Sequence, residues 1–561
     1  MSNLKVGVNV FPGESVNPIS GVSTARTAIV GNFLKGPVNI VTTVTSMAQF
    51  ESIFGTKPAP GTTGYYNVKA HFAQVGQAVT DIVRIASSTA AKATYTFQDR
   101  LEEPVNTLKV EFKYEGIEGN SYSVDVDDYH ILSTTLTEDI SADATSAVLT
   151  SVGGLEVGSD IHFHDGAFDE YVRIISINAS TKTVYWTGGL TNAYAAATAT
   201  VESMEFSLNV YYKGVLAETI TGMSMNDAVS FFCEKKSPTN LILTDLKAVD
   251  TAYTDLPAVT ASASALASGA DGLSDVVLTD YQGSQSLKTG LYALDGVDPF
   301  RVCCPNPELT DVDAVAAYKS LVQSLIDYVE NRRTMMVYVD VPLGTSRDDS
   351  ITFGANFESK KLVMPWPWQK VTESGLEKWL PPSSFTTGMC VKKDQELGVF
   401  KNPGNERLAY TEGVEYVMDD TENTMLADAG ICGIMQFPGE GIRFYGGRTR
   451  SAETAWKFIH VAELWNYLGR TLERGLRDVV FEVNDAALWA TVIRRVSTLL
   501  EYEKQRGAIT DYRVVMNSSN NPQDQVALGI ATLAVEYIPV GTVERLAIPL
   551  TSSPMGFAVA A

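Results

Sequence analysis

The sequence predicts an α+β multidomain protein, with mixed α/β core domains, an inserted all-β module and a C-terminal α+β domain. The chain has 561 residues, which is enough for roughly three or four domains of about 150 residues each. Strand-like and helix-like segments alternate near both ends, whereas short strands separated by turns fill residues 98–226. Hydrophobic residues at 45% and charged residues at 19% are typical of globular proteins with a large buried core.

The first segments are a lone strand and then an α/β unit. LKVGVNV, residues 4–10, alternates apolar with small or polar side chains but has no hairpin partner nearby. TARTAIVG, residues 24–31, predicts a second strand. SMAQFESIFG predicts a short helix with Ser46 as its N-cap and Gly55 at its end. A helix-like NVKAHFAQVG and a strand-like TDIVRIA follow before residue 86.

The middle of the chain predicts a β sandwich or a small barrel. Its turns recur at roughly 8- to 12-residue intervals, which is the spacing of short antiparallel strands. Residues 132–200 are predicted to form a compact module inserted between two outer pieces, because a surface loop tolerates an insertion whose ends remain close. This region is acidic, since residues 99–235 contain 7 Lys and Arg against 22 Asp and Glu.

The second half returns to alternating helices and strands. A low-complexity connector at residues 261–274 leads into the strand-like FRVCC and a helix near residues 311–332 with one apolar face. Apolar residues then recur every three or four positions from Phe458 to Leu476 and predict a further helix. DVVFEV, residues 478–483, reads as a short buried strand. Asp485 is expected to cap another helix that ends at Gly507, and three strands close the chain between residues 512 and 550.

Charge, cysteine content and hydropathy exclude several classes. A net charge of −23 repels phosphates and argues against a nucleic-acid binder. The five cysteines are odd in number and lack CxxC spacing, so we expect no disulfide framework. Cys303 and Cys304, at the end of the apolar run FRVCC, are expected to be buried thiols. No apolar run reaches the ~20 residues of a membrane helix, and the N-terminus does not resemble a signal peptide. We therefore expect a soluble protein made in the cytoplasm.

The sequence contains few signatures of catalysis. It lacks GxxxxGK[ST], HExxH, GxSxG and a strand-bound GxGxxG, so we expect no catalytic residue and no cofactor. His162 and His164 alternate on a predicted strand, next to Asp165, and can present two imidazoles on one face. Because no third ligand stands at a defined spacing, exposed strand residues are favoured over a metal site.

Two basic segments leave alternatives open. Phe437–Ser451, FPGEGIRFYGGRTRS, is rich in glycine and arginine, which suits either a phosphate cradle or a tight corner before a helix. Along the helix that starts after Asp485, basic side chains lie away from the apolar positions. They form either a solvated helix face or an electrostatic contact with a partner; these residues are Arg494, Arg495, Lys504 and Arg506.

The segment AGICGIMQFPGEGIRFYGGRTRS and the following WKFIHVAELWNYLGRTLERGLRDVVFEVNDAALWATVIRRV resemble tail sheath proteins of contractile-tailed bacteriophages and related contractile injection particles. NPISGVSTARTAIVGNFLKGPVN, WLPPSSFTTGMCVKKD and NSSNNPQDQVALGIATLAVEYIPV resemble further blocks of that family in the same order. The resemblance covers most of the chain outside residues 132–200. It implies that Phe437–Ser451 is a structural passage whose glycines form turns, without a phosphate site.

The resemblance implies a mechanical function and no enzyme activity. The chain is expected to form stacked hexameric rings around a tail tube and to contract on triggering by the baseplate, driving the tube through the target envelope. Its expected partners are further copies of itself, the tail tube protein, and baseplate and tail terminator proteins, without nucleic acid or stable membrane insertion. The expected location is the virion tail, assembled in the host cytoplasm. A β-rich receptor-binding or carbohydrate-degrading tail protein is the alternative.

The resemblance also implies a division of the chain and a set of contact residues. The expected parts are an N-terminal arm (1–25), the N-terminal part of the core (26–97), a β-rich outer region (98–235), a connecting segment (236–274), an α/β domain (275–436), a C-terminal inner sheath domain (437–542) and a C-terminal arm (543–561). The arms are expected to add strands to sheets of neighbouring subunits through Val6, Val8, Val10, Leu546 and Ile548. The tube-facing residues are expected to be Arg494, Arg495, Lys504 and Arg506.

Overall fold

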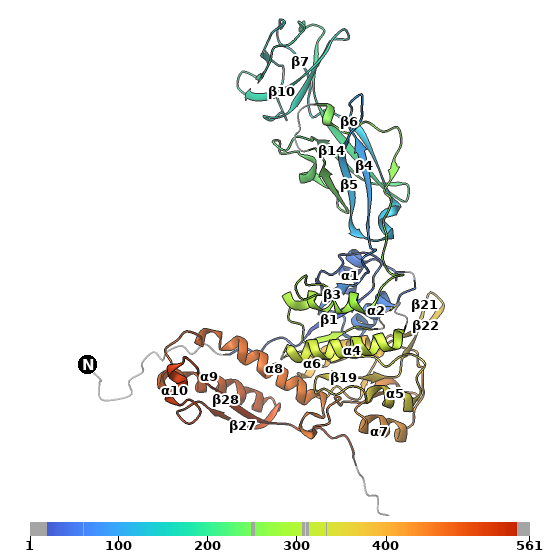
Figure 1. Cartoon of the computed structure of the whole chain (residues 1–561), viewed down its shortest axis with the longest axis vertical. Coiled ribbons are helices and arrows are strands. Elements are labelled where there is room, and N and C mark those ends of the chain that lie inside the picture. Colours follow the sequence, from blue (N-terminus) through green and yellow to red (C-terminus); the bar gives the residue numbers. More distant parts are fainter. Residues whose placement is uncertain are drawn as a thin grey trace, which may run out of the picture.

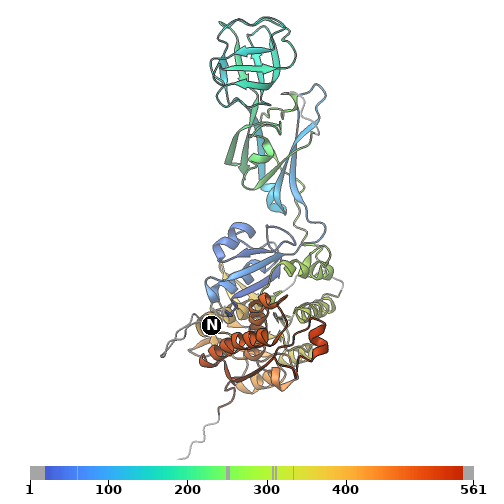
Figure 2. The same cartoon turned by 90° about the vertical axis from the view of Figure 1, so that its left-hand side faces the viewer.

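The protein consists of four units in a computed structural model that describes residues 19–59, 61–247, 253–305, 309, 313–332 and 334–546. A β barrel lies at one end of the longest axis and a β sandwich follows it (Figure 1). The α/β unit and the C-terminal unit pack together at the other end, as the turned view in Figure 2 also shows. The prediction of a mixed α/β multidomain protein is confirmed.

A six-stranded sheet in the order β19-β18-β17-β1-β3-β2 forms the centre of the α/β unit. Its pairs are parallel except for β2 with β3. Short apolar runs such as AIV and MVY suit strands that are covered on both faces. β1 pairs with β17, so segments from the first hundred residues and from beyond residue 300 form one sheet. The strands are β1 (Arg26–Gly31), β2 (Thr42–Val44), β3 (Val79–Arg84), β17 (Arg301–Cys303), β18 (Met336–Tyr338) and β19 (Leu362–Val363).

Helices cover both faces of this sheet. Ala28 and Val30 of β1 pack with α3 and α4 on one face, whereas Ile29 packs with α1, α2 and α6 on the other. The cap predicted for the first helix is confirmed, because the Ser46 side chain accepts a hydrogen bond from Gln49 N. The helices are α1 (Met47–Phe54), α2 (Gly64–Val75), α3 (Leu278–Gln282), α4 (Ala314–Asn331), α5 (Arg347–Gly354), α6 (Pro382–Leu397) and α7 (Asp420–Asp428).

Two smaller sheets complete the α/β unit. One has the order β20-β25-β26-β23, with β20 (Pro365–Trp366), β25 (Cys432–Phe437), β26 (Gly441–Phe444) and β23 (Glu406–Arg407). The other has the order β22-β21-β24, with β22 (Leu376–Leu380), β21 (Gln369–Glu373) and β24 (Gly413–Val414). The boundary expected between residues 436 and 437 falls within the β25–β26 hairpin.

The β sandwich consists of a three-stranded and a four-stranded sheet around one core that includes Phe112, Val126 and Phe206. The first sheet contains β15 (Leu241–Asp245), β5 (Asn106–Glu115) and β4 (Lys92–Gln98). The second contains β14 (Val215–Met223), β13 (Glu205–Tyr212), β6 (Tyr122–Tyr129) and β16 (Ser264–Ala265).

The β barrel lies in the chain between β6 and β13 and has its own core around Phe163 and Trp186. Its strand order is β7-β12-β9-β10-β11-β8, and a bridge between Leu136 and Leu149 links the two outer strands. Both a sandwich and a barrel are therefore present, where the sequence left the choice open. The strands are β7 (Ser133–Thr135), β8 (Ser146–Val148), β9 (Asp160–His164), β10 (Asp169–Asn178), β11 (Thr183–Trp186) and β12 (Thr200–Ser203).

The C-terminal unit packs two long helices on a two-stranded sheet, around a core that includes Leu464, Val496 and Leu500. The predicted cap is confirmed, because the Asp485 side chain accepts a hydrogen bond from Leu488 N. The elements are α8 (Ile459–Gly475), α9 (Ala486–Gln505), β27 (Ile509–Val515), α10 (Gln523–Ala527) and β28 (Ala534–Pro539). Short 3-10 turns in the chain are Ile117–Ser121, Cys233–Lys236, Tyr253–Asp255, Gly290–Gly296, Thr454–Trp456 and Arg477–Val479.

Two expectations for this unit are corrected. DVVFEV is not a buried strand: it forms the turn Arg477–Val479 and then a loop in which Phe481 has a φ of +74° and is fully exposed. The apolar pattern predicted a buried strand wrongly, because these apolar side chains are exposed on the surface. The third closing strand is not formed over residues 543–546, and its remainder lies outside the described residues.

The five cysteines are buried free thiols, and the burial predicted for Cys303 and Cys304 is confirmed. Burial raises the pKa of the Cys432 thiol to about 12, so this group stays protonated at neutral pH. Across the described ranges, no helix combines the length and apolarity needed to cross a membrane.

Candidate assembly surfaces of the C-terminal unit

A buried charge cluster fastens the C-terminal unit to the central sheet. Arg301 of β17 is 0% exposed and donates hydrogen bonds of 2.7 and 2.8 Å to the carboxylate of Glu463 on α8. It also donates one of 2.8 Å to Asp394 on α6. Burial alone would lower the pKa of Arg301, but these carboxylates hold it well above its usual range. Because three elements share one charged contact, we expect α8 and the sheet to move as one body.

The glycine- and arginine-rich stretch Phe437–Ser451 is bound to its own chain. A Cβ at Gly447 would lie 2.2 Å from Asn402 Oδ1, so glycine permits the close approach of these two segments. Arg450 donates to the carbonyl of Gly354 at 2.8 Å. Arg448 donates at 2.5 and 2.6 Å to both oxygens of Glu544. The stretch therefore forms a corner that contacts three other segments of the chain, at Gly354, Asn402 and Glu544.

The segment that ends the described chain is anchored at this corner. The Glu544–Arg448 pair lowers the pKa of Glu544, and Arg545 lies 3.1 Å from Asp428. Leu546 is 77% exposed and therefore available to a neighbouring chain. The other expected arm residues lie outside the described residues; they are Val6, Val8, Val10 and Ile548.

The N-terminal segment leaves from the same unit. Ile19 is 8% exposed in the core beside α8, and a Cβ at Gly475 would lie 2.4 Å from its Cγ2 atom. Val22 N donates to Thr471 Oγ1 at 3.3 Å. The described chain therefore begins beside α8 and ends beside the Phe437–Ser451 corner and α7.

The sheet of the C-terminal unit has only two strands in the part of the chain that the structure describes. β27 and β28 pair with each other in antiparallel register from Ile509–Pro539 to Val515–Ala534. The outer edge of each strand therefore has backbone donors and acceptors without a strand partner among the described residues. Such edges are templates for a strand from another chain, and a two-stranded sheet is only marginally stable by itself.

Exposed apolar side chains gather in the loops around this sheet. Val480, Phe481 and Val483 follow α8, and Leu528 and Ile530 follow α10. Asn484 Nδ2 donates to the carbonyl of Ile530 at 3.0 Å and joins the two loops. Neighbouring exposed apolar side chains are typical of protein–protein contact sites. Part of this surface comes from the run VVFEV, which by its sequence alone predicts a strand.

The four basic residues expected to face the tube differ in their exposure and in their partners. Arg494 is exposed, but Arg495 is 8% exposed and donates to Asp478 at 2.9 Å and to the carbonyl of Gly475 at 2.6 Å. Arg495 is therefore bound within its own unit, and its role as a tube contact stays a prediction. Lys504 is exposed and lies 3.1 Å from Asp511, whereas Arg506 lies 3.2 Å from Glu503 and packs on two aromatic rings.

The two histidines of β9 are partly buried and have an acidic neighbour that the sequence did not indicate. Asp165 is turned away, because it accepts hydrogen bonds from the backbone of Ala167 and Phe168. Glu202 of β12 lies opposite His162 in the sheet instead. The sequence could not predict the contact between His164 and Glu202, because these residues are 38 positions apart in the chain.

Among the described residues, the C-terminal unit combines a buried charge cluster, a sheet edge without a strand partner and exposed apolar loops. The same unit contains the match to a known family: residues 451–542 match the phage tail sheath C-terminal domain. This match, and relatives named tail sheath protein, confirm the relationship to tail sheath proteins that the sequence indicated.

Two relatives illustrate the extent of the similarity. A putative prophage major tail sheath protein of Pseudomonas aeruginosa is 24% identical over 271 residues, which are 46% of this chain and 67% of that protein. The tail sheath protein of Vibrio phage KVP40 is 26% identical over 149 residues, which are 26% of this chain. The matched part spans only 22% of the Vibrio phage protein.

Solved structures agree over nearly the whole chain and establish the fold. The helical sheath of the anti-feeding prophage in its contracted state has a TM-score of 0.53 at 14% identity, covering 98% of this chain and 100% of that one. A sheath tail protein from Listeria innocua has a TM-score of 0.54 at 12% identity, covering 93% and 96%.

Proposed function

We propose that this chain is the structural subunit of a contractile tail sheath. It polymerises as hexameric rings stacked around a tail tube, and it contracts when a baseplate triggers it. The observation that carries the proposal is the open β27–β28 sheet, because it lies within the residues that match the tail sheath C-terminal domain.

Strands from neighbouring subunits complete this sheet in the proposed assembly. The donated strands come from the N-terminal arm, residues 1–25, and the C-terminal arm, residues 543–561. About four or five backbone hydrogen bonds, at roughly 0.5–1.5 kcal/mol each, contribute a few kcal/mol per strand. One such contact is weak, but several per subunit in every ring hold firmly through multivalency.

Contraction requires contacts that rearrange without separating the subunits. The Arg301 cluster keeps α8 on the central sheet, so each subunit moves largely as one body. The terminal strands then act as tethers while the bodies rotate past one another. An extended sheath that waits for a trigger is held by a kinetic barrier between two such packings.

Assembly is expected to depend least on the β barrel. Its two ends are adjacent, because Ser203 N donates to the carbonyl of Leu132 at 2.8 Å. It also lies at the end of the molecule opposite the C-terminal unit (Figure 1). We propose that it is an insert on the outside of the sheath, where the acidity of the surrounding region favours solubility.

The test is assembly of purified protein with a tail tube protein, followed by negative-stain electron microscopy. The full chain is expected to form cylinders, and a chain trimmed before Ile19 and after Leu546 is expected to remain dispersed. Both cuts leave the Ile19 and Glu544 contacts in place. The matched control joins Leu132 to Ser203 through a short linker and is expected to form cylinders without the barrel. Normal cylinders from the doubly trimmed chain would refute the proposed tethers.

A further inference from the structure

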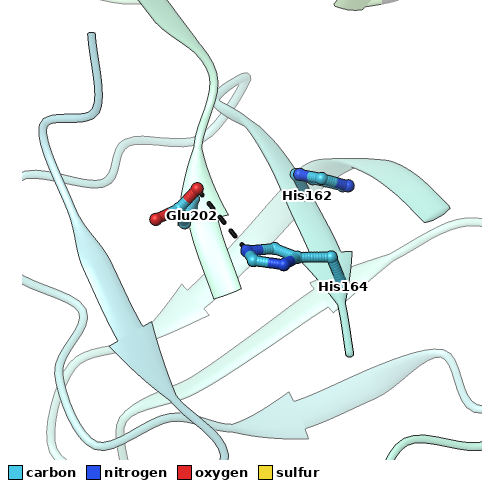
Figure 3. Close-up of side chains that lie close together, drawn as sticks. All are labelled: His162, His164 and Glu202. Carbon is cyan, nitrogen blue, oxygen red and sulfur yellow. Dashed lines mark ion pairs between the residues drawn. The ribbon is translucent and has the colours of Figure 1, made fainter. Parts of the chain in front are cut away.

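Three of the five histidines of the chain gather where the β barrel joins the β sandwich. His162 and His164 lie on β9, and His130 lies just after β6. Glu202 of β12 faces all three, one residue before the end of its strand. Figure 3 shows the Glu202 carboxylate directed at the ring of His164, with the ring of His162 above it. Phe163 points into the barrel core, so the flanking histidines lie on the outer face.

The distances suit a metal ion. Glu202 Oε2 lies 3.5 Å from His164 Nε2, and one ligand atom from each of His162, His164 and Glu202 lies within 4.8 Å of the others. Zinc binds imidazole nitrogen and carboxylate oxygen at about 2.0–2.2 Å in a tetrahedron, which places neighbouring ligand atoms about 3.3–3.5 Å apart. His164 Nε2 is buried without a hydrogen-bond partner among the described residues, although it faces this carboxylate.

Outer partners already orient these groups. His162 Nε2 is 2.9 Å from Asp169 Oδ1, which favours the proton on Nε2 and leaves Nδ1 as the ligand atom. Ser133 Oγ donates to Glu202 Oε1 at 2.9 Å, so Oε2 is the carboxylate oxygen that faces the histidines. The ring of His162 also stacks on that of Tyr171, with centroids 4.3 Å apart. Carboxylate–histidine pairs of this kind are typical of the surroundings of metal ligands.

We propose that His162, His164 and Glu202 bind one divalent zinc ion, with water completing the tetrahedron. Two imidazoles and one carboxylate match the ligand preference of zinc. These side chains remain between 15% and 32% exposed, so an ion has access from solvent.

The ion ties the barrel together near its junction with the sandwich. β9 and β12 are neighbours in the barrel, and β12 continues directly into β13 of the sandwich. His130, on the other connection between the two units, lies 3.4 Å from Glu202 Oε2 and donates from Nδ1 to the carbonyl of Ser203 at 2.5 Å. His130 is a positioning residue, and the bound ion fixes the carboxylate that it contacts.

The test uses the full-length chain freed of metal with a chelator. Calorimetric titration with zinc chloride is expected to give one site per chain, and cobalt(II) is expected to give the absorption spectrum of a tetrahedral ion. His164→Ala and Glu202→Gln each remove one ligand and are expected to weaken binding at least about tenfold. Glu138→Gln, at an exposed glutamate of the same barrel, is the matched control and is expected to bind like the native chain.

Zinc should also raise the melting temperature of the native chain and leave that of Glu202→Gln unchanged. Circular dichroism without metal shows whether each variant folds. If His164→Ala is unfolded, the decision rests on the native chain and Glu202→Gln. Absence of saturable binding to the native chain overturns the proposal. Equal affinity for the native chain and a folded Glu202→Gln variant also overturns it, because the ion is then adventitious.

Discussion

Replacing Arg301 with methionine is expected to release α8 from the central sheet. The substitution keeps an unbranched side chain but leaves the carboxylates of Glu463 and Asp394 buried without their counter-charge. Three hydrogen bonds to charged groups, at 2.7–2.8 Å, are lost. Each is worth about 1.5–3 kcal/mol net, and removing one partner of a buried ion pair costs about 3–5 kcal/mol. We expect a loss of about 3–5 kcal/mol from a total stability of about 5–15 kcal/mol.

Hydrogen exchange of the amides in α8, followed by mass spectrometry, measures this loss. At about 1.4 kcal/mol per factor of ten, exchange should accelerate roughly 10²- to 10⁴-fold. Arg513→Met is the matched control, because Arg513 and Glu536 are 3.8 Å apart and about 70% exposed. An exposed pair contributes about 0–1 kcal/mol. If the α8 amides exchange as slowly in Arg301→Met as in Arg513→Met, the Arg301 cluster does not couple the C-terminal unit to the central sheet.

Three further predictions follow from single side chains. Burial raises the pKa of Asp340, which accepts two hydrogen bonds from Ser383, to about 7. The native state therefore binds a proton that the unfolded state has released, and the unfolding free energy should fall as pH rises from about 4 to 7; urea titrations should show a flatter profile for Asp340→Asn. Arg495→Glu should lower the urea midpoint by breaking buried contacts, corresponding to about 1–3 kcal/mol, whereas exposed Arg494→Glu should change stability by less than about 0.5 kcal/mol. If Arg494→Glu nevertheless weakens co-sedimentation with the tube, the residue is a contact; unchanged binding contradicts that role. Phe481→Ser should leave the thermal midpoint of the monomer unchanged and reduce cylinder formation in electron micrographs, and normal cylinders would count against an interface at this loop.

Sequence reasoning predicted the features that depend on neighbouring residues. The caps at Ser46 and Asp485 and the helix near residues 311–332 were predicted because capping and amphipathic periodicity act within one or two turns. The alternation of strands and turns likewise indicated all-β structure in the middle of the chain. The same reasoning misplaced residues 478–483, because apolar side chains in this exposed loop have the composition of a buried strand.

The candidate sites depended on contacts between distant segments. Arg495 was predicted to face a partner from its place on a helix, but Asp478, from the preceding loop, binds it. Glu202 joins His162 and His164 only because β12 pairs with β9. Neither contact leaves a local pattern in the chain.

The sequence by itself determined the class of the protein: a mixed α/β chain with a β-rich middle and the relationship to tail sheath proteins. Helix caps, strand alternation and the sequence blocks that resemble the family depend on residues close together in the chain, so they can be predicted from the sequence. The tertiary structure alone decided that β1 and β17 share one sheet, that Arg301 is buried among carboxylates, and that β27 and β28 pair only with each other among the described residues. Hydrogen-bond pairing and burial join residues that are hundreds of positions apart, and only the folded chain brings them together.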